Sequence, residues 1–130
     1  MLDKAVMRLN QVTVAATDLA ASIAFYRTLG LKLIVQSEHY ARFELPEGGS
    51  TFSLHLAPEA ARENAPVIYF ECDVDTEHAR LTRAGLAFES GPQDQSWLWR
   101  EAHLRDPAGN QLILYAAGEN RLNPPWRLRD

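Results

Sequence analysis

The sequence has little cysteine, no long apolar run and no concentration of positive charge. Cys72 is its only cysteine, so an internal disulfide cannot form, and this favours a reducing compartment. The N-terminal MLDKAVMRLN lacks the apolar core of a signal peptide, and no apolar run approaches the ~20 residues that span a bilayer. The net charge is −4, and Lys and Arg form no cluster interleaved with aromatic residues. We therefore expect a cytoplasmic protein that binds neither nucleic acid nor a membrane.

The composition and the first half of the chain indicate a mixed α+β fold. Hydrophobic residues make up 46% of the 130 residues and charged residues 23%, which is typical of one globular domain spanning 1–130. A helix is predicted between an N-cap at Asp18 and a stop at Gly30. Runs of β-branched and aromatic residues predict strands at 8–16, 31–37, 39–45 and 50–57. This first module, 7–57, has the order β-α-β-β-β.

The pattern starts again after a polar linker at 58–65. In this second module, 66–117, a helix is predicted over 75–85, with Asp75 as its N-cap and Gly85 as its stop. Strands are predicted at 66–73, 86–90, 96–105 and 110–117, with a loop at 91–95. The C-terminal tail, 118–130, contains NPPW and is expected to be extended.

The two halves form an internal repeat. Asp18 and Asp73 are 55 residues apart, as are Gly30 and Gly85, and the turn LPEGGS of the first half is matched by RDPAGN in the second. One such unit cannot cover both faces of its sheet. We therefore predict two tandem β-α-β-β-β modules that form a curved mixed sheet, with helices on the convex face and a concave cavity for a ligand.

Three stretches carry a resemblance to a known family. They are TDLAASIAFYRTLGL (17–31), FECDVD (70–75) and DPAGNQLILY (106–115). Together they make the chain resemble the vicinal oxygen chelate superfamily, which contains glyoxalase I, bleomycin-resistance proteins and extradiol dioxygenases. The resemblance implies paired modules, often a homodimer, and a cavity that takes a small molecule. In metal-using members a divalent ion there chelates two neighbouring oxygens of the substrate.

The resemblance also implies positions for the metal ligands. In the first module these are Gln11, seven residues before the capping Asp18, and His55 on the last strand. In the second module the corresponding positions hold Val67 and Ile113, which have no ligating atom. A divalent ion held by Gln11 and His55 is therefore one alternative, and a cavity without metal, lined by His55, is the other.

Further candidates come from the alternation of side chains along the second module's strands. Alternation places Trp97, Trp99, Glu101 and His103 on one face of their strand, where Glu101 and His103 could supply a general base or a ligand pair. The alternative is a half-exposed edge strand whose charges lie in solvent. The predicted substrate-binding residues are Tyr69, Glu71, Trp97, Trp99, Ile113 and Tyr115.

Three functions are compatible with these sequence features. The first prediction is a metal-independent protein that binds a small, partly aromatic molecule in the concave cavity, as bleomycin-resistance proteins do. The alternative is a metal-dependent lyase, isomerase or dioxygenase with an atypical ligand set. The third is a structural or regulatory dimer with a vestigial cavity. The apolar Val67 and Ile113 favour the first.

Overall fold

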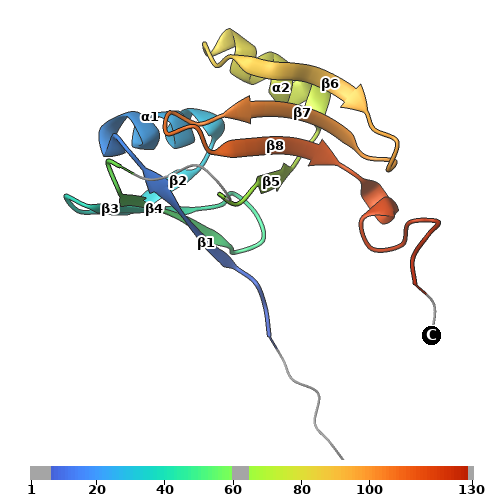
Figure 1. The fold of residues 1–130 in the computed structure, drawn as a ribbon, viewed down its shortest axis with the longest axis horizontal. Coiled ribbons are helices and arrows are strands. Elements are labelled where there is room, and N and C mark those ends of the chain that lie inside the picture. Colours follow the sequence, from blue (N-terminus) through green and yellow to red (C-terminus); the bar gives the residue numbers. More distant parts are fainter. Residues whose placement is uncertain (1–6, 60–64, 129–130) are drawn as a thin grey trace, which may run out of the picture. The chain divides into compact units, whose positions relative to one another are not determined.

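The computed structural model describes residues 7–59 and 65–128. The chain divides into two compact units, Met1–Ala60 and Ala61–Asp130. Each unit has the order β-α-β-β-β and its own four-stranded mixed sheet (Figure 1). The predicted tandem α+β modules are therefore confirmed. Among the described residues, no helix is long and apolar enough to cross a membrane.

The first unit contains five elements. They are β1 (Gln11–Ala16), α1 (Leu19–Leu29), β2 (Lys32–Gln36), β3 (Tyr40–Glu44) and β4 (Thr51–Leu56). The strand order is β1-β4-β3-β2, in which β1 runs parallel to β4 and the other pairs are antiparallel. β1 and β4 are parallel, so the chain must cross over between them, and α1 lies in this crossover connection. The helix packs against one face of the sheet, where it contacts β2, β3 and β4.

Helix α1 has the predicted caps. The Asp18 carboxylate accepts a hydrogen bond from the backbone N–H of Ala21 at 3.1 Å, and Gly30 adopts φ 117°, where a side chain would be strained. The buried side of the helix packs through Tyr26, whose ring centroid lies 4.6 Å from that of Phe52 and 5.9 Å from that of Phe43. These contacts show which side of the sheet faces α1.

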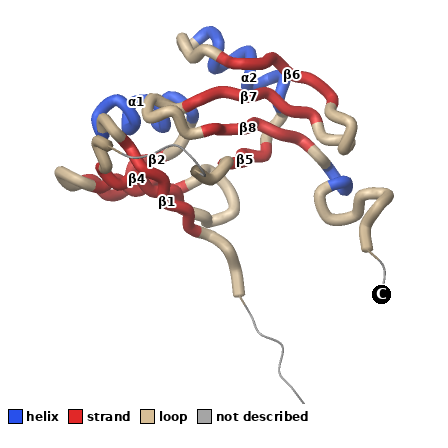
Figure 2. The backbone as a smooth tube through the Cα atoms, viewed as in Figure 1, coloured by secondary structure: helices blue, strands red, loops and turns tan. Residues whose placement is uncertain are grey.

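The second unit repeats the arrangement. Its elements are β5 (Ile68–Glu71), α2 (Val74–Arg83), β6 (Phe88–Asp94), β7 (Arg100–Arg105) and β8 (Gln111–Ala116). The strand order β5-β8-β7-β6 matches that of the first unit, with β5 parallel to β8. A short 3₁₀ turn, Gly118–Asn120, follows β8 (Figure 2).

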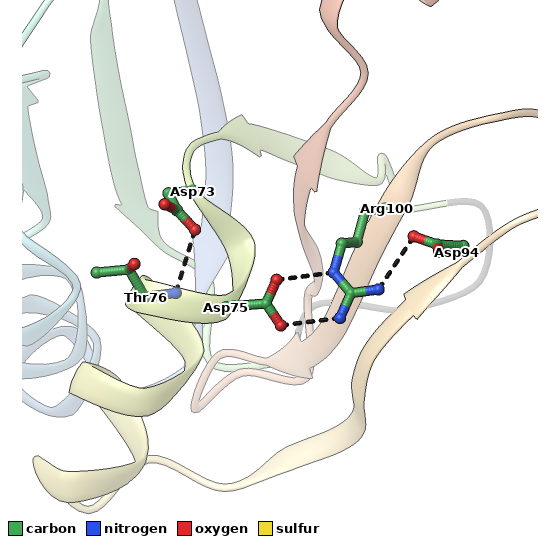
Figure 3. Close-up of polar contacts among 5 residues, drawn as sticks. All are labelled: Asp73, Asp75, Thr76, Asp94 and Arg100. Carbon is green, nitrogen blue, oxygen red and sulfur yellow. Dashed lines mark hydrogen bonds and ion pairs between the residues drawn. The ribbon is translucent and has the colours of Figure 1, made fainter.

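The predicted N-cap of α2 is wrong. Asp73, and not Asp75, caps this helix, because its carboxylate accepts from the backbone N–H of Thr76. Asp75 lies in the first helical turn, and its carboxylate makes a bidentate ion pair with Arg100, with both N···O distances 2.8 Å (Figure 3). Arg100 also binds Asp94 at 3.0 Å, so one guanidinium joins α2 to β6 and β7.

The predicted boundary between β6 and β7 is also wrong. The expected loop at 91–95 belongs mostly to β6, which tolerates Pro92 because it is the edge strand of the sheet and its register is irregular. The turn instead lies at 95–99, where Gln95 and Leu98 are joined by a backbone hydrogen bond of 3.0 Å. Leu98 has φ 70°, a left-handed conformation that is rare for leucine.

The turn between β7 and β8 forms as predicted. The buried Asp106 carboxylate accepts from the backbone N–H groups of Ala108 at 3.0 Å and Asn110 at 2.8 Å, and from the Asn110 side chain at 2.8 Å. Gly109 has φ 90°, which glycine adopts without strain. This turn fixes the register between the two strands that carry most of the candidate site.

Candidate functional site

Packing contacts identify which face of the second sheet is covered by α2. The His78 ring on α2 lies 4.5 Å from the ring of Phe88, and Phe88 is paired with Leu104 on β7. Side chains alternate along a strand, so Glu101 and His103 project from the opposite face. We call this surface, the one that faces away from the helix, the open face of the sheet.

The register of the strands brings the predicted residues of the second module together on this open face. One row contains Tyr69, Ile113 and His103, which are successive partners across β5, β8 and β7. The next row contains Glu71, Tyr115 and Glu101. Trp97 and Trp99 reach the same face from the turn that precedes β7.

Three aromatic side chains form a cluster on the open face. The Trp99 ring stacks on Tyr115 with centroids 4.7 Å apart and an interplanar angle of 22°. Tyr69 meets both rings edge-on, at 5.8 Å from Trp99 and 5.7 Å from Tyr115. Tyr69 is 47% exposed, whereas Ile113 and Tyr115 are buried. The aromatic cluster, Tyr69–Trp99–Tyr115, thus offers an exposed ring above an apolar base.

The environment of the aromatic cluster is acidic. Burial raises the pKa of Tyr69, and the negative charge of Glu101 raises it further. The pKa of Tyr115 is raised in the same way by burial and then by Glu71. Both phenols therefore remain neutral hydrogen-bonding groups at physiological pH.

Glu101 is the most buried ionisable side chain of this face. It is only 1% exposed, its Oε2 accepts from the indole N–H of Trp97 at 2.8 Å, and its Oε1 lies 2.8 Å from Nε2 of His103. The alternative expectation of charges in solvent is therefore wrong for Glu101. Sequence alternation predicted the shared face, but nothing in the sequence indicated that Trp97 would turn back onto the carboxylate.

The open face of the first sheet carries a hydrogen-bonded polar network that sequence reasoning missed. The Tyr40 hydroxyl lies 2.6 Å from the buried hydroxyl of Ser53 and accepts from Nε of Arg42 at 2.9 Å. The Gln11 amide donates to Ser53 at 2.8 Å, and its oxygen accepts from the Thr51 hydroxyl. The hydrogen bond with Ser53 lowers the pKa of Tyr40 despite some burial, and Arg42 lowers it further.

The structure does not bring Gln11 and His55 together. Gln11 is paired with Thr51, whereas His55 lies four residues further along β4, opposite Ala15 and Tyr40. That separation is about 13 Å along the strand. His55 is exposed, and the Gln11 amide is already bound within the polar network. The two residues do not form a shared ligand pair in this arrangement, and metal ligation by Gln11 and His55 stays a prediction.

Comparisons with known proteins identify the family. The sequence model of the Glyoxalase/Bleomycin resistance protein/Dioxygenase superfamily matches residues 8–114. The chain belongs to this superfamily. No curated protein sequence matches it significantly.

Solved structures of superfamily members have the same fold. A glyoxalase/bleomycin resistance protein/dioxygenase from Nocardioides is 25% identical with a TM-score of 0.76, and the match covers 98% of this chain and 93% of that one. A lactoylglutathione lyase from Agrobacterium tumefaciens is 22% identical with a TM-score of 0.70, covering 86% and 95%. A bleomycin-binding protein complexed with bleomycin is 18% identical with a TM-score of 0.68, covering 85% and 98%.

The register shows what this superfamily member has at the implied ligand positions. Gln11 and Val67 hold equivalent positions on the first strands of the two units, so Thr13 and Tyr69, two residues further on, are equivalent as well. Ser53 is the strand partner of Thr13, and Ile113 is the strand partner of Tyr69, so Ile113 is the structural equivalent of Ser53. The register thus puts Ser53, and not His55, at the first-module position equivalent to Ile113, so the four positions hold an amide, a hydroxyl and two hydrocarbons.

This donor set does not fit a firmly held divalent ion. Zn²⁺ and similar ions are bound in proteins by histidine, cysteine or carboxylate groups, and neither neutral residue supplies one. Within residues 7–59 and 65–128, no group of three or more His, Cys, Asp or Glu side chains is placed to hold a metal.

Proposed function

We propose that this superfamily member binds a planar small molecule without metal, by stacking it on the open face of the second sheet. The observation that carries the proposal is the aromatic cluster of Tyr69, Trp99 and Tyr115, with Tyr69 half exposed. Each aromatic pair contributes about 0.5–1.5 kcal/mol beyond the area that it buries. The buried Ile113 packs beneath the cluster together with Tyr115 and Trp99 and gives it an apolar base.

The charges around the aromatic cluster favour a neutral or cationic ligand. Glu71 and Glu101 lie in the row next to Tyr69, and the chain has a net charge of −4. A cation over an aromatic ring gains about 0.5–2 kcal/mol, whereas an anion would be repelled by both carboxylates. A superfamily structure complexed with bleomycin supports small-molecule binding as the use of this fold.

A metal-dependent lyase, isomerase or dioxygenase is the second candidate. It is favoured by the fold shared with a lactoylglutathione lyase, and it would need Gln11 and His55 to act with donors not adjacent to them here.

The proposal also includes a cytoplasmic location and a homodimer. Light scattering after gel filtration would measure the molar mass and so detect the dimer.

The binding proposal can be tested with planar probes of different charge. We expect proflavine, a planar cation, to bind in isothermal titration calorimetry and naphthalene sulfonate, a planar anion, to bind at least tenfold more weakly. Trp99→Leu should weaken proflavine binding about tenfold, because it removes one stacked ring. Trp126→Phe is the matched control, since that indole is exposed in the tail. Equal binding of both probes, or no effect of Trp99→Leu, would contradict the proposal.

The metal-dependent alternative has its own measurement. Protein purified without chelator is compared with an EDTA-treated sample by elemental analysis. The binding proposal expects less than one ion in ten molecules and the same proflavine affinity in both samples. One ion per chain that is lost on treatment, together with lost binding, would support the enzyme instead.

A further inference from the structure

The side-chain pair Glu101–His103 is arranged differently from an ordinary surface ion pair. The Glu101 carboxylate is 1% exposed, whereas the His103 side chain is 33% exposed. Their atoms Oε1 and Nε2 are 2.8 Å apart. One partner is therefore fixed within the protein while the other still reaches the surface.

Hydrogen bonding determines which nitrogen of His103 carries the proton. A carboxylate only accepts, so in the neutral imidazole the proton lies on Nε2, between the ring and Glu101. The lone pair is then on Nδ1, which has no hydrogen-bond partner among the described residues. The Trp97 indole donates to the other carboxylate oxygen, Oε2, and so holds the carboxylate in its orientation. A fixed carboxylate also stabilises the imidazolium that forms when Nδ1 takes up a proton.

His103 borders the surface on which the proposed ligand stacks. It is the cross-strand partner of Ile113, and Ile113 is the partner of Tyr69. Neighbouring strands are about 4.8 Å apart, so the edge of a ring stacked near Tyr69 and Ile113 comes within one strand spacing of the imidazole. A ligand that extends over Ile113 toward β7 can therefore bring an acidic proton to the hydrogen-bond distance, about 2.6–3.2 Å, that a general base needs.

We propose that His103 is a general base that removes a proton from the ligand on the open face, with Glu101 as its positioning residue. The C–H, N–H or O–H bond of the ligand breaks, its electron pair stays on the ligand, and the proton forms a new bond to Nδ1. The imidazolium returns the proton to another atom of the ligand or to solvent. The step needs no metal and no oxidant or reductant. It rests on the proposed binding function.

A nuclear magnetic resonance measurement on the free protein tests the arrangement of the dyad. In the wild type, imidazole ¹⁵N spectra at neutral pH should assign neutral His103 to the Nε2–H tautomer. In Glu101→Gln, Trp97 must still donate to the one amide oxygen, so the amide N–H₂ faces His103 and the proton moves to Nδ1. In Trp97→Phe/Glu101→Gln the amide can turn, and the Nε2–H tautomer should return. A wild-type Nδ1–H tautomer would overturn the proposal.

Nitrobenzisoxazole, a planar C–H acid, tests the chemistry. A base removes its ring C–H proton, the carbon–nitrogen triple bond forms, the N–O bond breaks, and the coloured cyanonitrophenolate is released. We expect a saturable rate above buffer that falls about 100-fold in His103→Gln and Glu101→Gln. Trp97→Phe/Glu101→Gln should recover much of the loss, which a merely structural defect would not allow. Binding of the probe is followed in the same samples by quenching of tryptophan fluorescence in the Trp126→Phe background, where Trp97 and Trp99 are the remaining indoles.

The outcomes separate the two proposals. Quenching with an equal rate in wild type and His103→Gln would overturn the base and leave the binding function intact. No quenching in the wild type, together with no binding of proflavine, would overturn the binding function and with it the base. Circular dichroism confirms that each variant is folded before its rate is compared.

Discussion

In the first unit the open face of the sheet carries a network of hydroxyl, amide and guanidinium groups, whereas in the second unit it carries an aromatic cluster beside carboxylates and a histidine. The backbones are equivalent, because strand order and pairing agree. Register makes Tyr40 the equivalent of Glu101, and Arg42 the equivalent of His103. The two helix-facing sides, in contrast, are both apolar. The repeat has therefore kept its core and changed its surface.

One position explains much of this difference. In the first unit, Ser53 supplies the hydroxyl that satisfies Tyr40. Its equivalent in the second unit is Ile113, which cannot bond to Glu101. The carboxylate is instead bound by His103 on its own strand and by Trp97, from a turn in which Leu98 is left-handed. The second unit thus uses a hydrogen-bond partner from a loop where the first unit uses one from the neighbouring strand.

The largest expected effect is a difference in stability between the turn that joins β3 to β4 and the turn that joins β7 to β8. Asp106→Ala should lower the free energy of unfolding by about 2–3 kcal/mol, because two buried backbone N–H groups and the Asn110 side chain lose a charged acceptor. Glu47→Ala, in the corresponding turn of the first unit, removes an exposed side chain and should change it by less than about 0.5 kcal/mol. Urea unfolding measures both. Equal losses would mean that the turns are energetically alike.

The next effect concerns the turn that only the second unit uses to reach its open face. Leu98→Gly should raise the free energy of unfolding by about 0.5–1 kcal/mol, because glycine adopts φ 70° without strain. Thermal unfolding measures the change. Leu122→Gly is the control, since Leu122 is also exposed but has no positive φ, and it should give no gain. A loss in Leu98→Gly would mean that the leucine side chain stabilises the turn by packing.

A smaller effect is expected from the ion pair that joins α2 to β6 and β7. Arg100 holds the pKa of Asp75 below its ordinary value of 3.8. A carboxyl with a lowered folded-state pKa contributes stability above its unfolded value and loses it as the pH falls through the folded value. Wild-type stability should therefore decrease below about pH 3.8 more steeply than that of Asp75→Asn. Parallel curves, measured by acid titration of the urea midpoint, would contradict this.

The smallest effect is a difference in ionisation between the open faces. The pKa of Tyr40 is lowered by Ser53 and Arg42, whereas those of Tyr69 and Tyr115 are raised by burial. Ultraviolet titration should therefore show Tyr40 ionising first as the pH rises. Ser53→Ala should move that first step to higher pH, and Thr28→Ala, on α1, should leave it unchanged. A first step that persists unshifted in Tyr40→Phe would show that another phenol is responsible.

Much of the fold followed from local signals. Asp18, Gly30 and Gly85 marked helix ends because capping and left-handed glycine have short-range causes. Asp75 was mistaken for a cap because an acidic residue in the first turn has the same sequence signature. The 55-residue repeat already pointed to Asp73.

The candidate site was predictable only as far as alternation reaches. Period-two spacing correctly put Glu101 and His103 on one face of β7, whereas the strand register, which the sequence did not give, places Tyr69 and Tyr115 on that same face. The turn at 95–99 was missed because Gly91 and Pro92 are strong turn signals but lie inside an edge strand. Leu98, which does lie in the turn, is a residue that does not signal a turn. Burial of Glu101 could not be predicted, because it depends on an indole that folds back over four residues.

The irregular outer strands have a consequence for how the protein behaves at high concentration. β2 and β6 are edge strands of their sheets, and each has a shifted register, at Leu33/Val35 in β2 and twice in β6. Pro92 also removes one N–H from β6. Such edges are poor templates for a further strand from another molecule. The exposed Trp97, in the turn after β6, is thus carried on a sheet that resists growing into aggregates through that edge.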